Sequence, residues 1–396
     1  MTYLVLFVCV AFGSYLSFYV LYTLMFVMSN FFHQGKKSPK LNPRTRFMVI
    51  IPAYNEELLL EKLLKSLAQQ DYQSNLMSVV VVADNCSDET ANVGRKNGAL
   101  VLERCDPDHR GKGYAIKHAL DNTSFKDYDA IFIVDADSVV SSNTLKNLDL
   151  TIQEGARIIQ CYNGLANPND SWFTRLMDVS RTFGNEILGP GKEKMALSSS
   201  LMGNGMCFVR DVLNKYGWHA FTVGEDVEYF ANMALQGERI AFANKARVYH
   251  RESVDLQQAT PQRLRWSSGR FAVSTKYGLR LLFNGFTRGR LLLIDAALHL
   301  ILPNPSLGIS LTVLLFLSCV IFPRLPYRWF LLSLFLILAI LQVGFFLIGV
   351  LYVEDKRKKL MAIFLAPVFL FWKSGLDLLS IIGVGRKSWV RTERKF

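Results

Sequence analysis

Two carboxylates one residue apart, Asp135 and Asp137, directly follow the apolar run at residues 131–134. A continuous apolar run indicates a strand buried on both faces, and open α/β folds bind ligands beyond the carboxyl ends of such strands. An Asp-x-Asp pair offers only oxygen ligands, which suits Mg²⁺ or Mn²⁺, above all when a phosphate-bearing substrate supplies further oxygens. Taken alone, the pair also fits two solvated aspartates where a strand ends.

Other residues that could take part in the same chemistry follow predicted strands or lie on predicted helices. They are Asp84, Glu225 with Asp226, and the cluster Gln262, Arg265 and Trp266. Glu225 and Asp226 open a predicted helix, where carboxylates also serve as N-terminal caps. His250 follows a predicted strand and could be a third metal ligand, although we expect a hydrogen-bonded surface histidine.

The elements that must position these residues alternate between strand and helix. Strands are predicted at 47–51, 77–83, 99–103, 131–134, 157–162 and 240–249, and a glycine-rich turn leads into a further strand within 203–210. Helices are predicted at 58–67, 89–97, 115–120, 172–188, 224–235 and from about 261. This alternation predicts an α/β fold with a mostly parallel sheet and helices on both faces. The polar clusters then meet at the carboxyl edge of the sheet, where a nucleotide would lie. Asn55 is expected to cap the first helix.

Apolar residues are concentrated at the two ends of this chain of 396 residues, which is 51% hydrophobic. Residues 1–34 contain no Asp, Glu, Lys or Arg, and their apolar stretch is long enough to span a bilayer. No basic segment precedes it and no small-residue cleavage site follows it, so we expect a transmembrane anchor and not a cleaved signal peptide. The basic linker at 35–46 then places the following residues in the cytoplasm.

The C-terminal third is also membrane-like. Full crossings are expected at 296–322 and 329–353, whereas 360–384 contains Pro367, Lys373 and Asp377 and is expected to lie in the interface or to re-enter. The basic tail that follows would remain cytoplasmic. The expected division is therefore an anchor at 1–34, a linker at 35–46, a cytoplasmic domain at 47–280 and a membrane region at 281–396.

The net charge of +12 could indicate nucleic acid, but the basic residues cluster beside the apolar segments instead of forming a surface with interleaved aromatic residues. The six cysteines are scattered without a Cys-x-x-Cys pair, which argues against a disulfide framework and against a zinc site. We expect a multi-pass protein of the cell membrane, inner or plasma, that contacts membrane lipid and no nucleic acid.

Five motifs occur in one order along the chain. They are Pro52-x-Tyr54-Asn55-Glu56, Asp84, Asp135-x-Asp137, Glu225-Asp226 and Gln262-x-x-Arg265-Trp266. Over residues 47–270 this ordered set resembles the membrane-bound family 2 glycosyltransferases, which include cellulose, chitin, hyaluronan and poly-N-acetylglucosamine synthases and, more distantly, ceramide glucosyltransferases. The resemblance implies a GT-A-like fold, with transmembrane and interfacial helices at both ends of the chain.

The resemblance also implies a role for each motif. Pro52, Tyr54, Glu56 and Asp84 would line the site for the base and ribose of a nucleotide-sugar, Asp135 and Asp137 would bind Mg²⁺ or Mn²⁺ at the diphosphate, and Asp226 would be the general base, with Glu225 a second candidate. Gln262, Arg265 and Trp266 would serve the diphosphate and the acceptor. Lys112 follows a glycine and could add positive charge near the diphosphate, or be a solvated lysine.

The implied reaction is an inverting transfer from a nucleotide-sugar, with UDP as the expected carrier. A single carboxylate that takes the proton of the acceptor hydroxyl fits one in-line displacement. Our main hypothesis for the acceptor is a growing β-linked polysaccharide, and the alternative is transfer of one sugar to ceramide, diacylglycerol or polyprenyl phosphate. A membrane scaffold with an inactive transferase domain is a third reading, against which the intact carboxylates argue.

Overall fold

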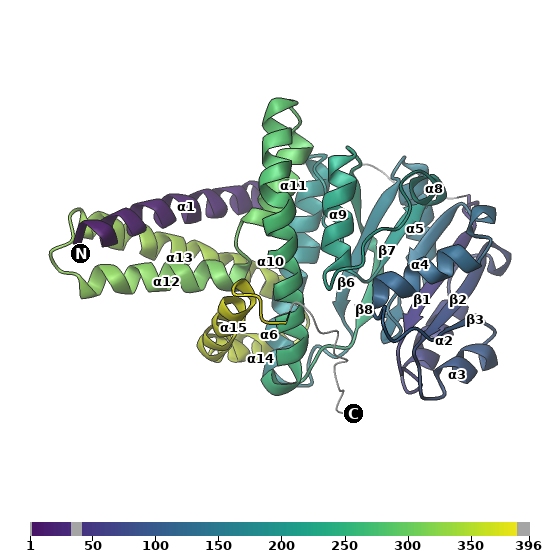
Figure 1. Cartoon of the computed structure of the whole chain (residues 1–396). Helices are drawn as coiled ribbons and strands as arrows, with labels where there is room; N and C mark the ends of the chain where they lie inside the picture. The colour runs from purple at the N-terminus through teal and green to yellow at the C-terminus, as the bar shows by residue number, and fades with distance from the viewer. Residues whose placement is uncertain (1, 33–41, 386–396) are drawn as a thin grey trace.

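The computed structural model describes residues 2–32 and 42–385 (Figure 1). Most of the predicted basic linker and nearly all of the predicted basic tail lie outside these residues. The described chain consists of an α/β body and a bundle of apolar helices that projects from one side of it.

One mixed sheet of eight strands forms the centre of the body. Its strands are β1 Phe47–Ala53, β2 Met77–Asp84, β3 Leu100–Arg104, β4 Ala130–Ile133, β5 Ser138–Val140, β6 Ile158–Leu165, β7 Met206–Val209 and β8 Ile240–His250. They lie in the order β3-β2-β1-β4-β7-β6-β8-β5. β3, β2, β1 and β4 are parallel, as are β6 and β8, whereas β7 and β5 run antiparallel to their neighbours.

Helices cover both faces of the sheet, as the alternating pattern predicts. The helices of the body are α2 Leu60–Ala68, α3 Thr90–Lys96, α4 Lys112–Asn122, α5 Thr144–Gln153, α6 Trp172–Phe183, α7 Gly189–Lys194, α8 Arg210–Tyr216, α9 Glu225–Leu235, α10 Leu256–Thr287 and α11 Leu291–Ile301. In β1, Met48 and Ile50 belong to one core cluster, with side chains of α4 and α9, while Val49 and Ile51 belong to another, with side chains of α2 and α5. Both faces of the strand are buried, which explains its continuous apolar sequence.

The strand directions bring the polar clusters to one edge. The carboxyl ends of β1, β2 and β4 lie at this edge because the three strands are parallel. β7 is antiparallel to β4, so its first residue, Met206, pairs with Ile133 at the same edge. The glycine turn before β7 therefore lies beside the Asp135–Asp137 pair.

Several local features differ from the sequence prediction. β5 was not predicted, and it pairs with β8 at the end of the sheet. α10 begins at Leu256, with Asp255 as its cap, so Pro261 lies inside the helix. Asn55 does not cap α2: it has a left-handed φ of 54°, and its side-chain oxygen accepts a hydrogen bond from the backbone N–H of Ser87 at 2.8 Å.

The apolar ends of the chain meet in one bundle. Its helices are α1 Thr2–Phe32, α12 Pro305–Ile321 and α13 Arg328–Leu351, with α14 Lys356–Ile363 and α15 Ala366–Ile381 at its base. α1 and α13 are each long and apolar enough to cross a membrane, and the pairs α11–α12 and α14–α15 are bent by 64° and 61°. In Figure 1, α1, α12 and α13 lie side by side, while α10 and α11 run across their base.

The predicted crossing at 296–322 is not one continuous helix. The chain turns between α11 and α12, where the side chain of Asn304 accepts the backbone N–H of Leu307 at 2.8 Å and caps α12. Only the 17 residues of α12 then continue along the bundle, about 25 Å at the helical rise. A break at a Pro-Asn-Pro sequence is expected because proline cannot continue a preceding helix.

α14 and α15 stay against the body. Lys359 of α14 donates hydrogen bonds to the carbonyl oxygen of Pro168 and to Asp178, both at 2.7 Å. In α15, the ammonium of Lys373 is paired with Asp377, and each bonds the hydroxyl of Ser267 in α10. The two charges that make 360–384 a poor membrane span are thus paired with each other and buried against α10.

Candidate active site

A lysine and an aspartate form the centre of the candidate site. Lys112 opens α4, and its ammonium donates hydrogen bonds to Asp135 and to the carbonyl oxygen of Gly203, the latter at 2.6 Å. Burial alone would lower the pKa of Lys112, but the charges of Asp135 and Glu225 outweigh it, and the pKa is raised. Lys112 is therefore a fixed cation in the site and not a solvated lysine.

Asp135 and Asp137 lie on the short connection between β4 and β5, at the carboxyl edge of the sheet. Within residues 2–32 and 42–385, no group of three or more His, Cys, Asp or Glu side chains could hold a metal ion by itself. An ion held by Asp135 and Asp137 would take its remaining ligands from a substrate. Two carboxylates with diphosphate oxygens would give the oxygen-only set that Mg²⁺ and Mn²⁺ prefer.

The glycine turn before β7 holds the segment between β4 and β5 in place through hydrogen bonds. The backbone N–H of Asp135 donates to the side-chain oxygen of Asn204 at 3.1 Å, and the Asn204 amide donates to the hydroxyl of Ser138 at 3.0 Å. Gly203 and Gly205 on either side have φ values of 78° and 71°, which favour glycine. Asn204 is a positioning residue that the sequence analysis did not single out, because nothing local marks a contact with a residue 69 positions away.

Glu225 and Asp226 lie at the N-terminus of α9, as predicted, and face the same centre. A Cβ atom on Gly203 would lie 3.4 Å from a carboxylate oxygen of Asp226 and 3.8 Å from the Lys112 ammonium. Burial, with the charge of Asp226 adding to it, raises the pKa of Glu225 to about 7. Burial also raises the pKa of Asp226, against the opposing effects of the Val227 N–H and Lys112.

α10 brings the Gln262, Arg265 and Trp266 cluster to the site. The charges of Glu225, Asp135 and Asp226 all act on the guanidinium of Arg265, whose pKa is nevertheless lowered by burial. Arg265 therefore lies close to both carboxylate pairs. Gln262 lies one turn earlier, and its buried side-chain oxygen has no hydrogen-bond partner among the described residues.

Backbone contact holds α10 against the start of α9. A Cβ atom on Gly269 would lie 2.9 Å from the backbone nitrogen of Gly224, and one on Gly224 would lie 3.2 Å from the carbonyl carbon of Gly269. The two helices can approach this closely only because both positions lack a side chain. The contact fixes Trp266, three residues before Gly269, relative to Glu225 and Asp226.

Two arginines lie over the ring of Trp266. The guanidinium of Arg263 is 4.8 Å from the ring centroid and that of Arg181 is 5.9 Å from it. Arg263 is also paired with the buried carboxylate of Glu252 at 2.5 Å. Arg181 comes from α6 and was not predicted, because no motif marks it and the contact spans 85 positions of sequence.

His250 does not lie on the surface, contrary to our expectation. It is 9% exposed, and its Nδ1 is 2.9 Å from the side-chain oxygen of Asn163. The same oxygen of Asn163 accepts a hydrogen bond from the side-chain amide of Asn204 at 3.4 Å. The histidine is hydrogen-bonded, as expected, but it belongs to the polar network that supports Asp135 through Asn204.

The residues expected at the base and ribose lie on, or just after, the two strands beyond β4, with β1 next to β4 and β2 on the far side of β1. Asp84 ends β2 and is 6% exposed, and Arg104 of β3 donates to it at 2.7 Å. Burial raises the pKa of Asp84, although Arg104 opposes the shift. Pro52 lies in β1, and Tyr54 and Glu56 follow it in the loop toward α2.

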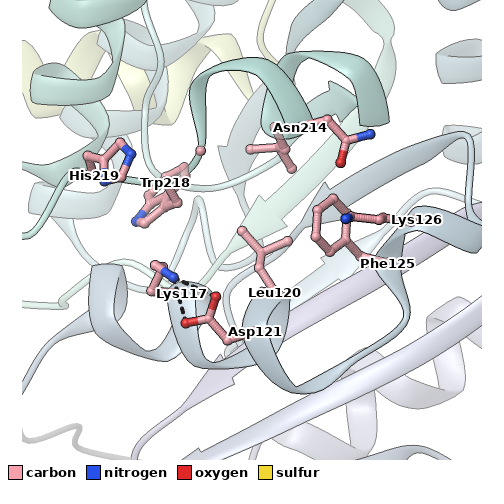
Figure 2. A pocket seen from close by; sticks show the side chains of 10 residues that line it. Lys117, Leu120, Asp121, Phe125, Lys126, Asn214, Trp218 and His219 are labelled. Carbon is pink, nitrogen blue, oxygen red and sulfur yellow. Dashed lines mark hydrogen bonds and ion pairs between the residues drawn. The ribbon is translucent and has the colours of Figure 1, made fainter.

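A separate cavity of about 380 Å³ lies at the other end of α4 (Figure 2). It is lined by Lys117, Leu120, Asp121, Phe125, Lys126, Leu213, Asn214, Gly217, Trp218 and His219. An ion pair between Lys117 and Asp121 lies at its wall. None of the predicted site residues lines this cavity.

Comparison with known proteins gives one family. Residues 43–269 match the model described as glycosyltransferase-like family 2. The chain is 25% identical over 251 residues to the probable glycosyltransferase YdaM of Bacillus subtilis, covering 61% of this chain and 58% of that protein. It is 25% identical over 232 residues to the β-monoglucosyldiacylglycerol synthase of Trichormus variabilis, covering 56% of this chain and 48% of the relative. The matched part of the chain thus spans about half to three fifths of the length of these relatives.

Among solved structures, the chain is similar to the mannosyltransferase PcManGT of Pyrobaculum calidifontis in complex with GDP-Man and Mn²⁺. The TM-score is 0.56, the identity is 18%, and the match covers 96% of this chain and 99% of that one. At this identity the likeness concerns the fold. It confirms the predicted GT-A architecture, with a mostly parallel curled sheet and apolar helices at both ends of the chain.

Proposed function

Because this chain belongs to the glycosyltransferase-like family 2, we propose that it transfers a sugar from a nucleotide-sugar, with Mg²⁺ or Mn²⁺, to an acceptor at the membrane surface. The observation that carries the proposal is the convergence of Lys112, Asp135, Asp226 and Arg265 at one edge of the sheet. These groups supply the cations that a departing nucleoside diphosphate needs and the carboxylate that an attacking hydroxyl needs. UDP is the carrier that we propose.

In this proposal Asp226 accepts the proton of the acceptor hydroxyl during attack. Its raised pKa makes it a better proton acceptor than an exposed aspartate. Lys112 and Arg265 hold the diphosphate, and Trp266 provides an apolar surface under a sugar ring. A divalent ion at Asp135 and Asp137 would act as a Lewis acid on the leaving group.

One base on the acceptor side fits a single displacement with inversion. The pKa of Glu225 is raised to about 7, so a large fraction of these carboxyl groups is protonated near neutral pH. The negative charge that Glu225 places beside Asp226 is therefore reduced. We therefore assign the base to Asp226, and to Glu225 a role in setting the charge around it. A retaining reaction would require a nucleophilic carboxylate in addition.

A lipid-linked acceptor fits the described structure better than a polymer that passes through the protein. α1, α12 and α13 pack on one another through apolar side chains such as Leu16, Leu315 and Phe335. The interior of this bundle is filled, whereas a polysaccharide needs a polar path. The name of one relative, β-monoglucosyldiacylglycerol synthase, indicates a lipid product and supports the proposal of a lipid acceptor.

Asp226→Asn tests the proposal. We expect transfer to fall about 10²–10⁴-fold, because the general base is lost, while calorimetric binding of the nucleoside diphosphate stays within a few-fold of wild type. The purified protein, incubated with radiolabelled nucleotide-sugars and membrane lipids, should yield labelled glycolipid. Labelled polysaccharide as the product would instead support the polysaccharide hypothesis, and loss of nucleotide binding would move Asp226 to the donor site.

A further inference from the structure

Arg181 is a cation that contacts Trp266 in the candidate site. Among residues 2–32 and 42–385, its guanidinium makes no hydrogen bond or ion pair, and it lies over the face of the Trp266 ring. Its neighbour Arg263 lies over the same ring but is neutralised by Glu252. Of the two guanidiniums over this ring, that of Arg181 is therefore the one without an ion pair.

The positive charge of Arg181 is unfavourable where it lies because the guanidinium is removed from water. Burial lowers the pKa of Arg181 to about 10, with the neighbouring charge of Arg263 also opposing protonation, but the side chain stays cationic at neutral pH. A partly buried cation is stabilised when an anion with hydrogen-bond acceptors approaches it. The planar guanidinium is suited to two parallel bonds to oxygen atoms of one anionic group.

The position of Arg181 separates it from the donor diphosphate. The ammonium of Lys112 bonds Asp135 directly. The guanidinium of Arg181 instead contacts the ring of Trp266, which the proposed function places under a sugar ring. α6, which carries Arg181, packs against α13 and α14 of the bundle.

We propose, building on the function proposed above, that Arg181 binds a phosphodiester of the acceptor, next to the hydroxyl that receives the sugar. A phosphodiester carries one negative charge and two free oxygen atoms, which suit the one guanidinium of the two that makes no ion pair. Asp226 is near enough to take the proton of an adjacent hydroxyl. The acceptor is then an anionic alcohol, such as a phosphatidylglycerol headgroup in the membrane or a polyol phosphate chain.

The test uses the full chain in nanodiscs and three acceptor probes: phosphatidylglycerol, diacylglycerol and soluble poly(glycerol phosphate). Wild type should prefer the phosphate-bearing probes by about 10-fold or more in kcat/KM. Labelled product from phosphatidylglycerol or from the polymer identifies the source of the phosphodiester. Arg181→Gln should raise the KM for that acceptor about 10–100-fold, the range for a charge-assisted hydrogen-bonded contact, with the KM for the donor within twofold.

Two further variants separate binding from a structural role. Arg181→Lys keeps the charge and should restore part of the acceptor affinity. Arg175→Gln, on the same helix, removes a guanidinium that bonds the carbonyl of Asn169 at 3.2 Å and should leave both KM values unchanged. A wild-type preference for diacylglycerol, or a rise in donor KM with Arg181→Gln, would overturn the inference. The proposed function itself fails only if no probe is glycosylated by wild type.

Discussion

At the scale of single residues, Lys112 connects the two carboxylate pairs of the site. Its ammonium is bonded to Asp135, and the charges of Glu225 and Asp226 act on it as well. Four carboxylates around one edge would repel one another if nothing stood between them. The lysine allows the Asp135–Asp137 pair and the proposed base to remain close before any substrate is bound.

The first prediction concerns the metal pair. Asp135→Asn or Asp137→Asn should lower transfer by on the order of 10²-fold or more, because stabilisation of the leaving diphosphate is worth several kcal/mol. EDTA should have the same effect on wild type, and Mn²⁺ or Mg²⁺ should reverse it. Asp71→Asn, which removes an exposed partner of Lys146, is the matched control and should retain activity. Full transfer in EDTA would show that no divalent ion takes part.

The second prediction follows from the pKa of Glu225. Its rise from an ordinary value of 4.5 to about 7 means that the folded protein binds this proton more tightly than the unfolded chain does. The contribution to stability therefore falls as the pH rises from about 4.5 to about 7, and is constant above. Glu225→Gln should abolish this fall and raise the apparent unfolding temperature in EDTA more at pH 8 than at pH 5.

The control for this measurement is Glu61→Gln, since Glu61 lies on the surface and pairs with Lys65. Its unfolding temperature should follow that of wild type through the same pH range. Equal gains for Glu225→Gln at pH 5 and pH 8 would show that Glu225 keeps an ordinary pKa in the folded protein.

At the scale of elements, the catalytic geometry depends on how closely α9 and α10 approach at Gly224 and Gly269. We predict that Gly269→Ala pushes the helices apart, because its Cβ would lie 2.9 Å from a backbone nitrogen that cannot move aside. Such overpacking costs about 1–3 kcal/mol. The kcat should fall about 10-fold or more, since Trp266 and Asp226 separate, while nucleotide binding is retained.

Gly375→Ala in α15 is the matched helical glycine, because no atom lies within 4 Å of its added Cβ. It should keep wild-type kcat. Unchanged kcat in Gly269→Ala would show that the spacing of the two helices does not limit the reaction.

How much of this arrangement could be predicted depends on the range of the interactions. Seven of the strands and the carboxylates at their ends follow from local apolar runs and from the rule that parallel strands share an edge. Arg181 and Asn204 could not be predicted, because their roles arise from contacts across 85 and 69 positions. β5 was missed because a strand of three residues shows no clear periodicity. The predicted cap at Asn55 was wrong because its side chain bonds to the loop after β2 instead of to α2.

At the scale of the whole molecule, the bundle implies a topology. The start of α1 and the loop between α12 and α13 lie at the free end of the bundle (Figure 1). The other end lies against the body, where Asn169 donates to Asp355 at 2.9 Å. We propose that α12 and α13 both cross the membrane and that α14 and α15 remain on the side of the catalytic domain, in the cytoplasm.

The topology predicts a labelling pattern, with the exposed Cys105 replaced by serine. Arg324→Cys, in the loop between α12 and α13, should react with a membrane-impermeant thiol reagent in intact cells. Glu354→Cys, just after α13, should react only after permeabilisation. Reaction of Glu354→Cys in intact cells would place the end of α13 outside and contradict the proposed crossings.

The family match ends at residue 269, but α10 continues to Thr287. Val273, Tyr277 and Leu281, in its second half, are buried in the core beneath the sheet, and Ser267 holds the Lys373–Asp377 pair of α15. An expressed fragment cut where the sequence similarity stops would therefore lose both part of the core and the helix that packs on Ser267. We expect such a fragment to fold poorly, so that activity assays require the apolar helices and the α/β body expressed as one chain.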